Sequence, residues 1–160
     1  MHKHIYENKI LRFAVSLSIC QLAGVIGSVF TASTVSTWYS TLIKPSFTPP
    51  SWLFGPIWIL LYFLMGTSLY LLWQNKAKDQ KKSLIIFGIQ LILNVCWSFL
   101  FFGLKSPLYG LIGILFLLAA IILTIAFSYR ISLHAVIALI PYLVWVSFAT
   151  ILNYAILSLN

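Results

Sequence analysis

Acidic side chains are nearly absent from this chain of 160 residues. Glu7 and Asp79 are the only two, against ten lysines and arginines, and charged residues make up 8% of the sequence. A soluble domain carries about 25% charged residues, and a disordered chain contains few apolar ones. Hydrophobic residues reach 61% here, so the composition excludes both a soluble globular enzyme and a disordered chain.

The few charges leave five long uncharged windows. They are 22 to 31 residues long and cover 13–43, 45–75, 83–104, 106–129 and 131–160. Because about 20 apolar residues cross the hydrocarbon core of a bilayer as a helix, each window is long enough to span it. Unbroken apolar runs disfavour the alternating strands of a β-barrel, and a lipid-exposed backbone must satisfy its own hydrogen bonds. We predict an all-α integral membrane protein, one bundle of five transmembrane helices in a single domain over 1–160. The expected helices are roughly 10–31, 52–74, 83–103, 108–129 and 133–157, after a short polar tail over 1–9.

Cysteine is also scarce, and the basic residues lie at the ends of the windows. Cys20 and Cys96 fall in separate windows, whereas a disulfide framework or metal site needs more and closer cysteines, so we expect no metal. Eight of the ten basic residues fall on the predicted side of the N-terminus, and the net charge of +8 therefore indicates membrane topology rather than nucleic-acid binding. The positive-inside rule predicts a cytoplasmic N-terminus. A cleaved signal peptide ending near 31–33 is the alternative, although its apolar core would be unusually long.

No window contains an acid within its apolar run. A proton-coupled transporter normally needs an ionisable group inside the membrane, and carboxylate acid–base catalysis needs a carboxylate near the substrate, so both are disfavoured. Amides, hydroxyls and aromatic rings recur instead at spacings of three and four, which place them on single helix faces. These faces include Gln21, Gly24, Ser28 and Thr31; Trp58, Tyr62 and Gly66; Gln90, Asn94, Trp97 and Phe101; and Tyr142, Trp145, Ala149 and Asn153. If they turn inward, they enclose a space suited to a flat apolar ligand with polar edges. Interfacial aromatic belts and plain helix packing are the alternative.

The connection over 32–51 is the longest in the chain. It contains Lys44, Pro45, Phe47, Pro49 and Pro50. Three prolines in six residues prevent a regular helix and stiffen the backbone. Structured loops of about 20 residues are usually functional, so we interpret this segment as a lid, with a plain connector as the alternative.

Several long motifs resemble the translocator protein family, also called the tryptophan-rich sensory protein (TspO/MBR) or peripheral benzodiazepine receptor family. The matching residues run Trp38-Tyr39, Lys44-Pro45-Ser46-Phe47-Thr48-Pro49-Pro50, Gly55-Pro56-x-Trp58, Gln90-x-x-x-Asn94-x-x-Trp97, Pro141-Tyr142-Leu143-x-Trp145 and Phe148-Ala149-Thr150-x-Leu152-Asn153-Tyr154. The resemblance covers nearly the whole chain. It implies a five-helix bundle, often homodimeric, in a cell membrane that the short tails suggest is prokaryotic.

The resemblance also implies a ligand and a site. The ligands it suggests are tetrapyrroles such as porphyrin or haem, sterols, and synthetic drugs, with no cofactor required. The ligand-binding residues it implies are Trp38, Tyr39, Trp58, Tyr62, Asn94, Trp97, Trp145, Ala149 and Leu152. Bacterial members are described as promoting light-dependent porphyrin breakdown, and the tryptophans tied to that activity resemble Trp58 and Trp145.

This sequence departs from the family pattern at three places. No basic residue follows Tyr154, where animal members complete a sterol-recognition pattern, so sterol binding through that pattern is not expected. Thr48 stands where a histidine is often found, and Tyr109 where a tryptophan is common.

The function expected from the sequence is a membrane tetrapyrrole-binding protein that acts as sensor, carrier or scavenger. Light-dependent porphyrin oxidation is the enzymatic alternative, and the sequence shows no nucleophile, acid or metal site for a reaction in the dark. Two further functions stay open at this point. The chain could be a regulatory membrane protein that acts through a partner protein, or a transporter that binds sterols or lipids.

Overall fold

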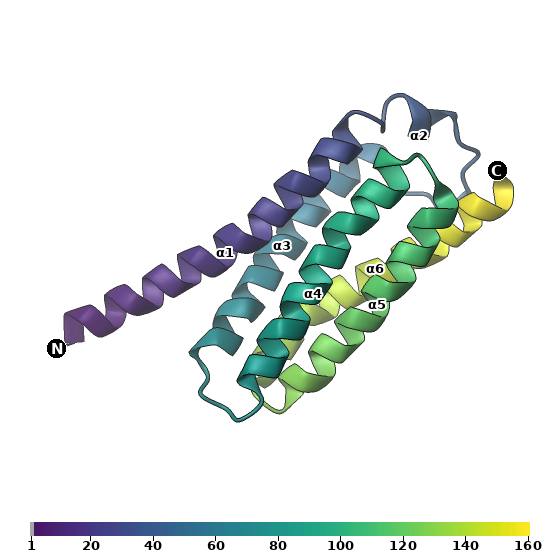
Figure 1. Cartoon of the computed structure of the whole chain (residues 1–160). Helices are drawn as coiled ribbons and strands as arrows, with labels where there is room; N and C mark the ends of the chain where they lie inside the picture. Colours follow the sequence, from purple (N-terminus) through teal and green to yellow (C-terminus); the bar gives the residue numbers. More distant parts are fainter. Residues whose placement is uncertain (1) are drawn as a thin grey trace.

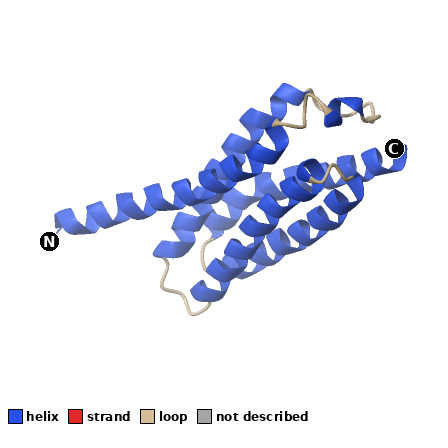
Figure 2. Cartoon of the chain, turned by 45° about the horizontal axis from the view of Figure 1, so that its top comes forward, coloured by secondary structure: helices blue, strands red, loops and turns tan. Residues whose placement is uncertain are grey.

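The computed structural model describes the backbone of residues 2–160 and the side chains from Lys9 onward. The helices are α1 (His2–Ala32), α2 (Trp38–Thr41), α3 (Ser51–Gln74), α4 (Gln80–Ser98), the π-helix η1 (Phe99–Gly103), α5 (Pro107–Tyr129) and α6 (Leu133–Leu159). Five of the helical segments are long and apolar enough to cross a membrane. Over residues 2–160 the structure holds no strand (Figure 2). The expected bundle of five membrane-spanning helices is confirmed.

Three local features differ from the sequence-based expectation. The first helix begins at His2 instead of near residue 10, because no proline or glycine interrupts the chain before Gly24. The segment expected to be a polar tail therefore extends α1 beyond the other helices at the N-terminal end (Figure 1). The short helix α2 lies inside the expected loop, and the end of the third span is a π-helix.

The five long helices form a closed ring. α1 packs on α3, α3 on α6, α6 on α5, α5 on α4, and α4 returns to α1. The loop that carries α2 lies at the same end of the bundle as the C-terminus, while the N-terminus and the α3–α4 turn lie at the other end (Figure 1). This arrangement leaves the interior bounded by helices from different parts of the chain and closed at one end by the loop.

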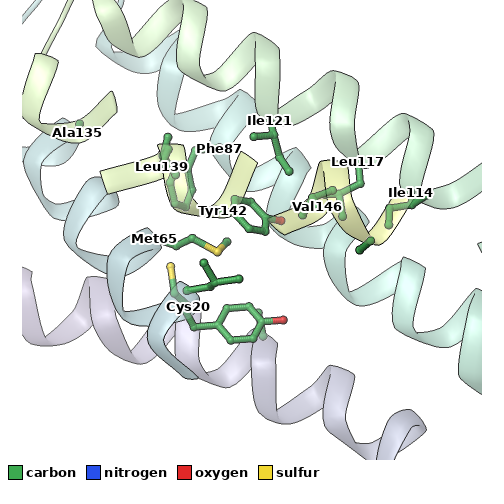
Figure 3. Close-up of a cluster of buried hydrophobic side chains, with 14 of the residues drawn as sticks. Cys20, Met65, Phe87, Ile114, Leu117, Ile121, Ala135, Leu139, Tyr142 and Val146 are labelled. Carbon is green, nitrogen blue, oxygen red and sulfur yellow. The ribbon is translucent and has the colours of Figure 1, made fainter. Parts of the chain in front are cut away.

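The interior of the ring away from α2 is a packed apolar core. Met65, Phe87, Leu117, Leu139 and Tyr142 are all at most 1% exposed, and their side chains point toward one another from different helices (Figure 3). These buried side chains fill the space between the helices at this level of the bundle.

The tight turns are made by capping residues that the sequence supplies locally. Ser106 and Ser132 precede α5 and α6, and each side-chain oxygen accepts a hydrogen bond from the backbone N–H three residues later, at 3.3 Å. Pro107 follows directly at the first position of α5, where its missing N–H costs nothing. Between α4 and α5, Lys105 has a φ of 52°, a conformation in which glycine is the usual residue.

Candidate ligand-binding cavity

A cavity of about 440 Å³ lies between the core and the loop. Its walls come from α1, the loop, α3, α6, and the end of α4 with η1. Pockets for drug-sized ligands measure about 300–1,000 Å³ and are mostly apolar with a few polar groups. The cavity has the size and composition of a small-molecule site.

Aromatic rings form one wall of the cavity. Trp58 lies nearly parallel to Tyr62, with ring centroids 5.5 Å apart, and 6.2 Å from Trp97. Trp97 in turn stacks on Phe101 at 5.9 Å. Trp58, Tyr62 and Trp97 come from stripes that the sequence predicted to face inward, and all three line the cavity. Extended stacks of this kind present flat, polarisable faces to a ligand.

A chain of hydrogen bonds lies directly behind this wall. The Tyr62 hydroxyl donates to Asn94 Oδ1, and Asn94 Nδ2 donates to the Tyr142 hydroxyl at 3.0 Å. Asn94 is 1% exposed and Tyr142 is fully buried. Asn94 therefore satisfies two phenols in a membrane interior, where an unpaired polar group is costly, and it sets the position of the Tyr62 ring.

A second polar contact joins the cavity wall to the α4–α5 turn. Trp97 Nε1 donates to Asn153 Oδ1 at 3.4 Å, while Asn153 Nδ2 donates to the carbonyl of Pro107 at 2.8 Å. Asn153 lines the cavity. Its amide fixes the Trp97 indole and supplies one of the few polar atoms near the cavity.

The π-helix contributes two aromatic rings to the cavity wall. Phe101 and Phe102 both line the cavity from η1. Leu104 N donates to Phe99 O across five residues, at 2.8 Å, which is the wider turn of a π-helix. Both rings of the cavity wall from this segment therefore lie within a π-helical turn.

The loop contributes Val35 and Tyr39 to the cavity. Tyr39 is 5% exposed and packs against Phe101 and Phe102 at 6.2 and 5.8 Å. Burial raises the pKa of its phenol above the ordinary value of 10.0, so Tyr39 is neutral at physiological pH. Lys44 lies over the Tyr39 ring at 4.9 Å and donates to the carbonyl of Leu42 at 3.0 Å.

The structure brings together six of the nine ligand-binding residues implied by the family resemblance. Those that line the cavity are Tyr39, Trp58, Tyr62, Trp97, Ala149 and Leu152, whereas Trp38, Asn94 and Trp145 lie outside its lining. The lid residues also lie outside it: Phe47 packs on Phe148 at 6.3 Å, Pro45 accepts a turn hydrogen bond from Thr48, and Pro50 precedes α3. Pro49 and Lys44 belong to the same connection and do not line the cavity. Ligand contact by any of these residues stays a prediction.

Trp145 occupies a second layer. Its ring lies 5.9 Å from Phe54 and 5.6 Å from Phe148, and Phe54 lines the cavity in front of it. The indole N–H of Trp145 is buried and has no acceptor among the described residues. The two tryptophans linked to light-dependent chemistry are thus not equivalent, because only Trp58 borders the cavity.

The cavity also has residues in its wall that face outward from the bundle. Val25 of α1 and Ile59 of α3 line it and are 60% and 64% exposed. Gln21 Nε2 donates across the same helix pair to the Ile59 carbonyl at 3.2 Å. Both exposed residues belong to membrane-spanning segments, so the side of the cavity between α1 and α3 borders the lipid.

Sequence reasoning missed several lining residues. Phe54 and Ser98 lie four residues from Trp58 and Asn94, so extending those stripes by one turn would have found them. Gly55 and Ile59 lie three residues before Trp58 and Tyr62, and Phe102 lies four residues after Ser98, so the same spacing would have included them as well.

The five-helix fold agrees with what comparison with known proteins finds. A model described as the TspO/MBR family matches residues 16–159. This chain belongs to the TspO/MBR family. It is an integral membrane protein, as the family and the five apolar helices together show.

Relatives within the TspO/MBR family include archaeal, bacterial and animal proteins. "Tryptophan-rich protein TspO" of Archaeoglobus fulgidus is 49% identical over 151 residues, which cover 94% of this chain and 98% of that protein. The protein of the same name from Chlorobaculum tepidum is 44% identical and covers 96% and 99%. The human "Translocator protein" is 37% identical over 82% of this chain and 79% of its own length.

Proposed function

We propose that this protein binds a tetrapyrrole, such as a porphyrin or haem, in the aromatic cavity and serves as a sensor, carrier or scavenger of it. The observation that carries the proposal is the stacked wall of Trp58, Tyr62 and Trp97 around a cavity of about 440 Å³. A planar macrocycle gains stacking energy against such a wall. The described lining includes no charged side chain, which favours a ligand whose body is apolar.

The lipid-facing side of the cavity supports the same class of ligand. Val25 and Ile59 connect the cavity wall to the bilayer, and apolar tetrapyrroles partition into membranes. A ligand dissolved in the bilayer would reach the cavity between α1 and α3 without crossing water.

Binding can be measured by titrating protoporphyrin IX into the full chain in detergent and following the porphyrin absorbance band. Trp58→Ala removes the central ring of the wall, and we expect the affinity to fall by about tenfold or more, since an aromatic contact contributes on the order of 1 kcal/mol beyond its burial. Trp52→Ala is the matched control. Trp52 lies on the same helix, is 72% exposed and is outside the cavity, so its loss should leave binding unchanged.

A second pair of variants tests the cavity by filling it. A Cβ atom added at Gly55 meets no atom within 4 Å, and Gly55 lines the cavity. Gly55→Leu should therefore fold normally and weaken porphyrin binding. Gly88 has the same open surroundings but lies outside the cavity, and Gly88→Leu should bind as the wild type does. Equal binding by all four variants and the wild type would contradict a site in this cavity.

Light-dependent oxidation of the bound porphyrin, with dissolved dioxygen as the oxidant, is a second candidate, which the position of Trp58 favours. An indole that borders the cavity can exchange an electron with an excited ligand, whereas Trp145 is screened by Phe54. Under illumination, Trp58→Phe should keep the stacking surface but slow the loss of porphyrin absorbance more than Trp145→Phe does. If neither variant changes the rate and dark controls are stable, the tryptophans take no part in the chemistry.

A further inference from the structure

A second, open hollow lies at the opposite end of the bundle from the cavity. It measures about 370 Å³, and the side chains that line it include Arg12 of α1, Trp73 of α3, Lys76 of the α3–α4 turn, and Gln80 and Lys81 of α4. This is the end at which the N-terminus and the α3–α4 turn lie (Figure 1). Three cationic side chains from three separate segments therefore converge on one concave surface.

Two contacts hold the hollow in shape. The Arg12 guanidinium lies over the Trp73 ring at 5.6 Å, a cation–π arrangement that orients a long side chain. Gln80 Nε2 donates to the carbonyls of Leu72 and Trp73, at 3.1 and 2.9 Å. This amide ties the start of α4 to the end of α3. It also satisfies carbonyls that would otherwise present partial negative charge at the end of a helix.

Among the side chains from Lys9 onward, the charges of the hollow are unbalanced. Asp79 is the one carboxylate among the described side chains, and it pairs with Lys82 at 3.7 Å instead of with a cation of the hollow. Lys81 lies in the first turn of α4, which contains no acidic residue; Asp79 precedes this turn as the N-cap and is the partner of Lys82. Because the N-terminal end of a helix carries partial positive charge, a cation there is unfavourable. A bound anion would relieve that repulsion and the repulsion among Arg12, Lys76 and Lys81.

The depth of the hollow matches the membrane surface. Arg12 and Trp73 lie within one or two turns of the points where the apolar runs of α1 and α3 meet charged residues. Tryptophan is typical of the headgroup level of a bilayer, and Leu84 adds an apolar edge on the side of the hydrocarbon. Basic pockets between transmembrane helices at this level bind anionic lipid headgroups.

We propose that the hollow of Arg12, Lys76 and Lys81 binds a phosphate group, supplied by the headgroup of an anionic phospholipid in the leaflet on the N-terminal side. The guanidinium offers a planar set of donors to the phosphate oxygens, and the two lysines add charge from the turn and from α4. The site is separate from the aromatic cavity and does not depend on what that cavity binds.

The test is native mass spectrometry of the full chain in a neutral detergent, with phosphatidylglycerol and phosphatidylcholine of identical acyl chains as probes. The wild type should retain phosphatidylglycerol in preference to phosphatidylcholine. Arg12→Gln with Lys81→Gln should weaken phosphatidylglycerol binding by roughly 30-fold, as expected from the loss of two interfacial cations. The matched control is Lys78→Gln with Arg130→Gln, which removes the same charge at the same end but outside the hollow and should change binding less than threefold.

A charge-reversal variant, a competition with inorganic phosphate and a porphyrin titration complete the test. Lys76→Glu reverses a charge at an exposed position, so it should fold normally and still abolish the preference. Inorganic phosphate at millimolar concentration identifies the source of the anion: displacement of the lipid indicates a site that also accepts free phosphate, and no displacement indicates a site that needs the lipid. Equal losses in the hollow and control double variants, or equal retention of both lipids by the wild type, would overturn the proposal. Protoporphyrin titration of the same variants should be unchanged, which separates this site from the proposed tetrapyrrole site.

Discussion

At the scale of single residues, Asn94 determines the geometry behind the cavity wall. One amide accepts from Tyr62 and donates to Tyr142, so it links three helices through groups that lipid cannot satisfy. The sequence placed Asn94 on an inward stripe, which is confirmed by its 1% exposure. Its partners were not predictable from spacing, because hydrogen bonds between helices depend on how the helices are rotated.

Replacing Asn94 by alanine is expected to lower the free energy of unfolding by about 1–3 kcal/mol, because two buried hydroxyls lose their partner. Thermal unfolding of the purified protein in detergent measures this change. Tyr62→Phe removes one hydroxyl together with its need for a partner and should cost less. A melting temperature for Asn94→Ala equal to that of the wild type would mean that the phenols find other partners.

At the scale of elements, the loop is attached to the bundle at several points. Asn160 Oδ1 accepts from the backbone N–H of Ile43 at 3.0 Å, and Asn160 Nδ2 donates to the Ile43 carbonyl at 2.9 Å. Tyr39 of α2 packs against Phe101, and Lys44 donates to the carbonyl of Leu42, next to the end of that helix. The prolines explain why 45–50 is not helical, while these contacts explain why the loop has one position over the cavity.

Asn160→Ala should release the loop from α6. Each lost hydrogen bond is worth about 0.5–1.5 kcal/mol, so we expect backbone amide exchange over 40–48 to become faster by about tenfold. Hydrogen–deuterium exchange with mass spectrometry measures this in the full chain. Ser158→Ala is the control, since Ser158 bonds only within its own helix, to Tyr154. Exchange rates that are the same in both variants would show that Asn160 does not restrain the loop.

At the scale of the whole molecule, close contact between α1 and α3 closes the ring below the cavity. A Cβ atom at Gly66 would lie 2.8 Å from the Leu17 Cα atom, so only glycine permits this approach. Small residues at such crossings are typical of membrane helices, where packing rather than water drives association. The same two helices border the lipid-facing side of the cavity higher up, at Val25 and Ile59.

Gly66→Ala is expected to destabilise the bundle by roughly 1–3 kcal/mol, because backbone has to move to admit the methyl group. Gly88→Ala is the matched change on α4, where an added Cβ meets nothing within 4 Å. Alanine favours a helix over glycine by up to about 1 kcal/mol, so this variant should be as stable as the wild type or more so. Thermal unfolding of the two variants side by side measures the difference, and equal melting temperatures would contradict the tight crossing.

The sequence by itself determined the five spans and the inward direction of Trp58, Tyr62, Asn94 and Trp97. Hydrophobicity summed over a window decides whether a helix crosses a bilayer, and polar or aromatic residues three and four apart share a face whatever surrounds them. These are local properties, so they can be read without knowing which helices meet.

Only the tertiary structure decided how those faces combine. The π-turn at the end of the third span, the helix α2, and the position of Trp145 behind Phe54 all depend on packing between segments distant in the chain. The order of helices around the ring also decides that the cavity borders lipid between α1 and α3, and that Arg12, Lys76 and Lys81 share one hollow. Such contacts follow from the relative rotation and depth of whole helices, which no spacing within a single helix specifies.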